Sequence, residues 1–195
     1  MKKFELTAES KIIAGKKLFR IKALISFGNV KEGELGGFVE KEENLDQSGN
    51  AWVYGNAWVY GNAEVYGDAE VSGDARVYGD ARVSGDAWVY GNAEVYGDAW
   101  VYGNAEVYGD AEVSGDAEVS GDADYATVHG FGSEYRTTTF FRTKAGDIGV
   151  RCGCFYGTLE EFRAKVKETH GETKTAKEYL RVADLMEFRF SKEEV

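Results

Sequence analysis

Few residues of this sequence could carry catalytic chemistry. Its 195 residues include two histidines, His129 and His170, and two cysteines, Cys152 and Cys154. A histidine could deprotonate a hydroxyl or an amine, because its pKa lies near neutrality. The two thiols stand in the stretch RCGCF, where strand alternation places them on one face and favours a structural role over redox or metal chemistry. The sequence contains no P-loop, no G-x-S-x-G and no Cys/His set at zinc spacing, so we expect neither a metal nor a cofactor.

The residue types best suited to holding a ligand gather between positions 136 and 151. Arginine binds phosphate through charge-assisted hydrogen bonds, and hydroxyl groups can add further hydrogen bonds. We therefore predict an anion-binding group that consists of Arg136, Thr137, Thr138, Thr139, Arg142 and Arg151. The alternative interpretation is that these side chains form the solvated face of a hairpin.

Two strands and two helices are expected to position this group. The residue pattern predicts strands over Thr137–Thr143 and Ile148–Cys152. Thr158 and Glu161 have the spacing of a capping box, which predicts the start of a helix. A second helix is predicted over about Thr175–Phe188.

A six-residue repeat fills the middle of the chain. From Gly49 to Ser120 the sequence reads G-[ND]-A-[WER]-V-[YS] twelve times without an insertion. A degenerate copy follows at 121–126, and two looser copies precede the array at 37–42 and 43–48. Within each copy, alternation places Ala and Val on one face and the variable residue on the other, and Gly with Asn or Asp supplies a turn. A short strand and a corner, repeated in this way, predict a solenoid.

Read from Val53, the repeat V-Y-G-N-A-W resembles the hexapeptide repeat of left-handed parallel β-helix proteins, with an aliphatic residue first and a small residue fifth. The resemblance extends from Gly37 to about Ala126. It implies three hexads per coil, a left-handed helix and about five coils stacked ~4.8 Å apart. Proteins of this family commonly form trimers.

The flanking stretches GELGGFVEKEENL and TTTFFRTKAGDIGVRCGCFYGTLEEFRAKVKETHG resemble modules of bacteriophage and prophage proteins. We therefore expect a mainly β protein with three parts. These are an N-terminal β cap at residues 1–36, a left-handed parallel β-helix of about five coils at 37–126, and a small C-terminal α+β module at 127–195.

Three hexads per coil would stack residues eighteen apart on one face. Arg76 would then lie between Trp58 and Glu94, an arrangement that suits a cation–π contact and an ion pair. The variable position points outward, which predicts an aromatic contact surface that includes Trp52, Trp58, Trp88 and Trp100. The Tyr/Ser position adds a predicted tyrosine stack of Tyr60, Tyr78 and Tyr96. Such a surface indicates either a homo-oligomer, with a trimer favoured, or stacking on a base or sugar.

The net charge of −11 is unevenly distributed. Residues 1–31 carry eight Lys and Arg against two acids, whereas residues 32–126 carry three against twenty-one, a balance of −18. The β-helix should therefore repel DNA. No apolar run approaches the ~20 residues of a membrane helix. The start MKKFELTAESK lacks the apolar segment of a signal peptide, so we expect a cytoplasmic protein without membrane contact.

Together these features predict a non-enzymatic, phage-encoded protein that counters host defence in the cytoplasm of an infected or lysogenic bacterium. It would sequester a small nucleotide signal in pockets of an oligomer, or act as an acidic decoy for a host protein. Enzymes of the resembled family are acyltransferases with a histidine base at the cleft between protomers, so an acyltransferase that uses His129 is a further alternative. A structural or scaffold protein is the last.

Overall fold

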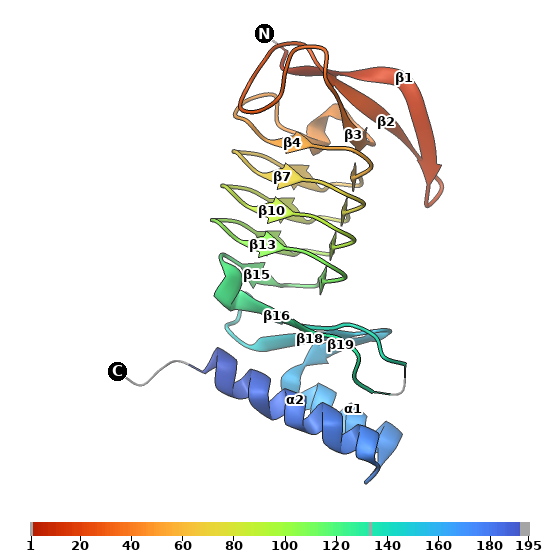
Figure 1. The fold of residues 1–195 in the computed structure, drawn as a ribbon, viewed down its shortest axis with the longest axis vertical. Coiled ribbons are helices and arrows are strands. Elements are labelled where there is room, and N and C mark those ends of the chain that lie inside the picture. Colours follow the sequence, from red (N-terminus) through yellow and green to blue (C-terminus); the bar gives the residue numbers. More distant parts are fainter. Residues whose placement is uncertain (1, 133, 192–195) are drawn as a thin grey trace.

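The computed structural model describes residues 2–132 and 134–191 and shows a rod with a different structure at each end (Figure 1). N-terminal strands cover one end of a β-solenoid, and a small sheet with two helices covers the other. The fold is mainly β, with about five coils, as the repeat predicts. No helix in the described ranges is both long and apolar enough to cross a bilayer.

The hexads form very short strands that stack in three parallel sheets. Each strand pairs with the strand eighteen residues away, as Trp58 with Arg76 and Val59 with Val77. This register confirms three hexads per coil. The strands within the described residues are β4 (Trp52–Val53), β5 (Trp58–Val59), β6 (Glu64–Val65), β7 (Glu70–Val71), β8 (Arg76–Val77), β9 (Arg82–Val83), β10 (Trp88–Val89), β11 (Glu94–Val95), β12 (Trp100–Val101), β13 (Glu106–Val107), β14 (Glu112–Val113) and β15 (Glu118–Val119).

The solenoid interior consists of the alanine and valine of every hexad. These side chains are fully buried from Ala51 to Val119, apart from 1% exposure at Val65. The glycine of each hexad occupies the left-handed region of backbone space, as at Gly85 with φ of +69°. Backbone hydrogen bonds join successive coils, such as the 2.9 Å bond from the Asp80 N–H to the Gly97 carbonyl.

The N-terminal cap extends one of the three sheets. It comprises β1 (Phe4–Ile13) and β2 (Lys16–Ala23), and the chain then enters the solenoid through β3 (Leu35–Val39) and a 3-10 turn η1 (Glu42–Asn44). Because β3 lies parallel to β5 and continues that sheet, the looser copy at 37–42 already belongs to the first coil.

Trp52 is buried under this cap, so its prediction as part of an exposed contact surface is wrong. Its ring makes edge contacts with Phe4 at 6.2 Å and Phe27 at 5.4 Å between centroids, and the side chain is 0% exposed. The side chain does leave the coil outward, as its place in the hexad requires. The N-terminal segment folds over it, because an indole of this size stabilises the fold when it is removed from water.

The C-terminal module is a four-stranded antiparallel sheet covered by two helices. Its elements are a 3-10 turn η2 (Asp122–Asp124), β16 (Tyr125–Val128), β17 (Thr138–Arg142), β18 (Ile148–Cys152), β19 (Phe155–Thr158), α1 (Leu159–His170) and α2 (Lys174–Phe190). The predicted capping box is confirmed: the Glu161 N–H donates to the Thr158 hydroxyl at 3.2 Å, and the Thr158 N–H donates to the Glu161 carboxylate at 2.8 Å.

The sheet of this module lies between the last coil and the helices (Figure 1). Neighbouring residues of β17 belong to different cores: Phe141 packs with the solenoid interior and Phe140 packs with the helices. Both are fully buried. The side chains of β17 therefore alternate between the coil and the helices.

Candidate functional site

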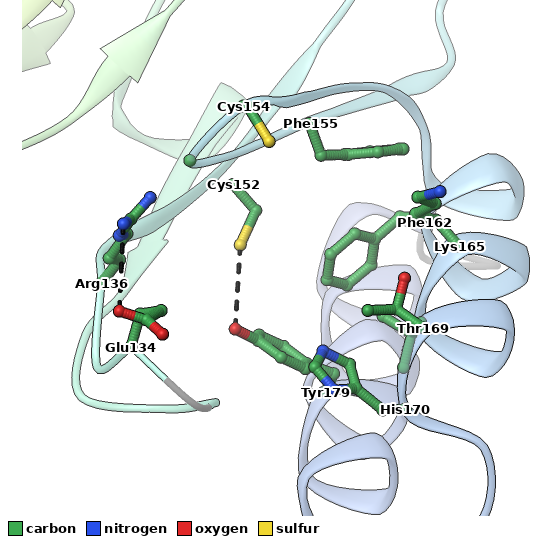
Figure 2. Close-up of a pocket in the computed structure, with 12 residues that line it drawn as sticks. Glu134, Arg136, Cys152, Cys154, Phe155, Phe162, Lys165, Thr169, His170 and Tyr179 are labelled. Carbon is green, nitrogen blue, oxygen red and sulfur yellow. Dashed lines mark hydrogen bonds and ion pairs between the residues drawn. The ribbon is translucent and has the colours of Figure 1, made fainter.

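A ligand-sized cavity of about 300 Å³ lies in the C-terminal module, between the β18–β19 hairpin and the two helices (Figure 2). The helices contribute aromatic, aliphatic and cationic side chains, and the hairpin with the loop before β17 contributes a further ring, the two thiols and a pair of opposite charges. The lining residues are Glu134, Arg136, Cys152, Gly153, Cys154, Phe155, Phe162, Lys165, Val166, Thr169, His170 and Tyr179.

A tight turn shapes the hairpin side of the cavity. Cys152 pairs with Phe155, so Gly153 and Cys154 form a two-residue loop between β18 and β19. Gly153 has φ of +57°, a conformation that glycine adopts without strain in such turns. A Cβ atom at Gly153 would lie 2.9 Å from a guanidinium nitrogen of Arg136. The glycine therefore both forms the turn and leaves space for the arginine.

Phe162 is the centre of the aromatic wall. It is 3% exposed and contacts Phe155 at 5.5 Å and Tyr179 at 5.7 Å between ring centroids, the latter edge-to-face. Phe162 and Val166 are four residues apart on α1, which places both on the face that looks toward the sheet. The rings are inclined to one another by 55° and 88°, so they give the cavity an apolar but uneven wall.

Three cationic or potentially cationic side chains line the cavity, with Arg136 on the side of the loop before β17 and Lys165 and His170 on the side of α1 (Figure 2). Arg136 has a carboxylate of Glu134 at 3.9 Å, and both side chains are largely exposed. Lys165 pairs with Glu168 at 2.9 Å, also in solvent. Exposed pairs of this kind are worth little, about 0–1 kcal/mol. Both cations can therefore exchange their present partner for an anionic ligand.

Cys152 has hydroxyl groups, not an imidazole, as its hydrogen-bond partners among the described residues. The Thr138 hydroxyl donates to its sulfur at 3.2 Å, and the sulfur lies 4.0 Å from the Tyr179 phenol oxygen. Burial, together with the nearby Cys152, raises the pKa of Tyr179 to about 12. The phenol is therefore protonated at neutral pH and cannot serve as a base. This arrangement suits hydrogen bonding to a ligand better than activation of a nucleophile.

Only Arg136 of the six predicted ligand-binding residues lines the cavity. Thr138 lies behind the cavity wall, with its hydroxyl on Cys152. Thr139 points the opposite way, where its hydroxyl accepts the backbone N–H of Glu112 at 3.0 Å. The prediction that these residues form one group is wrong, because strand alternation sends adjacent residues of β17 to opposite faces of the sheet.

The two remaining predicted arginines hold the module together. Arg142 faces the helices, where it donates to the Phe190 carbonyl and lies 3.9 Å from the carboxylate of Asp124. Arg151 faces the last coil and donates to the Glu112 carboxylate at 2.8 Å. Both therefore fasten the sheet to its neighbours and lie outside the cavity.

His129 lies outside the cavity too. It follows β16, is exposed to solvent, and its Nδ1 lies 3.1 Å from the hydroxyl of Thr137, another of the predicted residues. The assignment of a donor and an acceptor in this contact depends on the tautomer of the ring.

Sequence reasoning missed the residues of α1 and α2 that line the cavity. A signal was available on α1, because Phe162, Lys165, Val166 and Thr169 recur at a spacing of three and four residues. Residues at this spacing usually form the buried face of a helix. The cavity is recognisable only when the folded structure brings Tyr179 and the β18–β19 hairpin to face them.

The predicted ladders on the solenoid surface are present. The rings of Tyr60, Tyr78 and Tyr96 stack at 5.0 and 4.8 Å between centroids. Arg76 lies with its guanidinium 4.8 Å from the Trp58 ring. These contacts are made within the chain, so they stabilise the rod whether or not the surface binds a partner.

Comparison with known proteins finds one family description. Residues 75–91, in the middle of the array, match a family model described as the YdcK beta solenoid repeat. No curated protein matches the chain. The fold and this match define a β-solenoid protein, here with a ligand-sized cavity in a C-terminal module.

Proposed function

We propose that this chain is a non-enzymatic binding protein that sequesters a small aromatic anion, with a nucleotide as the expected class, in the cavity of its C-terminal module. The observation that carries the proposal is the meeting of an aromatic wall with Arg136 and Lys165 in one cavity of about 300 Å³. Pockets of this size and composition are typical of small-molecule sites.

The lining of the cavity offers partners for both parts of a nucleotide. Phe155, which is partly exposed beside the buried Phe162, provides an apolar ring against which a base can pack. Arg136 from the loop before β17 and Lys165 from α1 provide donors for anionic groups on opposite sides of the cavity. The hydroxyl and thiol groups near Cys152 can bind polar edges of the base. Glu134 at the rim disfavours ligands that carry several negative charges on that side.

The surroundings of the cavity support a role in binding. It is formed by one chain, so a ligand can be held whether or not the protein forms the trimer that we expect from the resemblance to left-handed β-helix proteins. The resemblance of both ends to phage and prophage modules supports a cytoplasmic role against a host signal. A nucleotide messenger of bacterial immunity is the ligand class that fits both arguments.

Native mass spectrometry of the protein purified from its bacterial host, repeated after denaturing extraction of small molecules, tests this proposal first. We expect a bound mass of nucleotide size. The recovered class is then titrated in a thermal-shift assay. A ligand at one hundred times its Kd should stabilise the fold by about 2.7 kcal/mol, which for a chain of this length raises Tm by about 5–10 °C.

Variants on α1 and before β17 locate the ligand. Arg136→Gln and Lys165→Gln should remove most of the shift. Lys167→Gln is the matched control, because Lys167 is on the same helix but does not line the cavity. Absence of both a bound mass and a shift with nucleotide pools would contradict sequestration. A shift that survives both cavity variants would place the ligand elsewhere.

A further inference from the structure

One wall of the solenoid presents aromatic rings between carboxylates. This wall, which we refer to as the Trp88 face, is formed by β7, β10 and β13 and directs Glu70, Trp88 and Glu106 outward in register. Tyr90 and Tyr108 lie beside them. The side chains of Trp88 and Tyr108 are 40% and 51% exposed, which makes them two of the most exposed large aromatic residues of the described solenoid.

The rings of the Trp88 face are held in place by the rod itself. The Trp88 indole N–H donates to the Ser72 hydroxyl at 3.0 Å, and its ring lies 4.5 Å from Tyr90. Tyr90 stacks on Tyr108 at 5.3 Å and donates to Glu106 at 3.3 Å. A surface with so little freedom loses little conformational entropy when a partner binds.

The other two walls carry cations of their own at the level of β8 and β9. Arg76 lies 4.8 Å from the Trp58 ring and donates to Glu94 at 2.6 Å. Arg82 lies 3.9 Å from the carboxylate of Glu64. Each of these walls thus holds a guanidinium supplied by the chain: Arg76 between an indole and a carboxylate, and Arg82 beside a carboxylate.

The Trp88 face has the same kind of ladder without a cation. None of the variable positions on this face is an arginine, and the indole has Glu70 and Glu106 as its neighbours in register. Within the described ranges, neither glutamate takes part in a salt bridge. From this contrast we infer that the Trp88 face binds an arginine-bearing basic segment of a partner protein.

The chemistry of such a segment matches the face. A guanidinium stacks on an indole and pairs with carboxylates, as Arg76 does within this chain. The face covers three coils, spaced by about 4.8 Å each, so it can receive several residues of an extended segment. The balance of −18 over residues 32–126 would also attract a basic partner from a distance. The site is separate from the cavity and does not depend on nucleotide binding.

Two pairs of glutamate variants test this inference with the same change in charge. The first protein carries Glu70→Gln and Glu106→Gln on the Trp88 face. The matched control carries Glu64→Gln and Glu118→Gln on the wall of β6, β9, β12 and β15, where Glu118 accepts a tyrosine hydroxyl as Glu106 does. The aromatic pair is Trp88→Ala and Trp100→Ala, since both indoles bond to a serine and pack on a tyrosine.

Binding is measured by fluorescence anisotropy with a labelled peptide of alternating glycine and arginine, at low and at physiological salt. We expect the Trp88 face variants to raise Kd by about tenfold, and the control variants to change it by less than about twofold. If both glutamate pairs weaken peptide binding equally, the effect is due to net charge alone and the inference is overturned. Absence of peptide binding would overturn it as well. Self-association of the protein that is lost with Trp88→Ala would instead assign the face to a second copy of the chain.

Discussion

Replacing Gly85 by alanine should destabilise the solenoid much more than the same replacement at Gly109. The two glycines occupy the same place in the hexad and have nearly the same backbone angle, with φ of +69° and +67°. They differ in what lies on the next coil. A Cβ atom at Gly85 would lie 2.9 Å from the nitrogen and 3.0 Å from the oxygen of Gly103, whereas a Cβ atom at Gly109 would meet nothing within 4 Å.

The difference in free energy of unfolding follows from these contacts. Alanine in the left-handed region costs about 1–2 kcal/mol, and this cost is common to both positions. At Gly85 the new methyl also pushes against backbone that accepts a 2.8 Å hydrogen bond from the Asp86 N–H, so it cannot move aside freely. Overpacking of this kind costs about 1–3 kcal/mol. We expect a loss of about 2–5 kcal/mol for Gly85→Ala and about 1–2 kcal/mol for Gly109→Ala.

Urea denaturation followed by far-UV circular dichroism measures both variants against the wild-type protein. Thermal unfolding checks the order of stability, since at this chain length each kcal/mol shifts Tm by about 2–4 °C. Equal losses at the two positions, or a larger loss at Gly109, would refute the reasoning, because the glycines would then matter through φ alone and not through the stacking of coils.

Three further predictions concern the caps and the tyrosines. Trp52→Ala should cost about 3–5 kcal/mol and speed hydrogen exchange in β1 and β2, since the indole is fully buried under them; unchanged exchange would show that the cap does not depend on Trp52. Thr158→Ala should cost about 1 kcal/mol in urea denaturation through loss of the helix cap, and no loss would mean that the capping box adds nothing. Alkaline pH should destabilise the fold. Burial raises the pKa of Tyr54 and Tyr179 to about 12, whereas the unfolded phenols lose their protons near pH 10. The folded state then binds more protons, so the free energy of unfolding falls as pH rises from 10 to 12. Urea midpoints at pH 9 and pH 11.5 check the sign, and a higher midpoint at pH 11.5 would contradict it.

Much of the fold could be predicted from the sequence because the solenoid is built from local rules. Within each hexad, the alternation along the strand places Ala and Val inward, and Gly allows the chain to turn. Each coil then packs only on the coils next to it. The eighteen-residue register was therefore accessible from ladders such as Trp58–Arg76–Glu94. The start of α1 was accessible for the same reason, since a capping box involves residues only three apart.

The cavity could not be predicted in this way. The cavity forms only when the helices pack on the sheet, which brings together Phe162 on α1, Tyr179 on α2 and Arg136 before β17. No periodicity in the sequence indicates that these residues line one cavity. The predicted anion-binding group failed for a related reason. The six residues of that group are close in the sequence, but adjacent side chains of a strand point to opposite faces of the sheet. Thr138 therefore faces the helices and Thr139 faces the coil.

The sequence by itself thus determined the architecture of the rod: its period, its interior, its ladders and its acidic surface. The tertiary structure alone decided which of the repeated positions remain accessible and where the cavity lies. Trp52 and Trp88 occupy equivalent positions in the hexad, yet one is buried by the N-terminal segment and the other is 40% exposed. The physical reason is that short-range steric and turn preferences specify repeated units, whereas burial depends on contacts between segments that are distant in the chain.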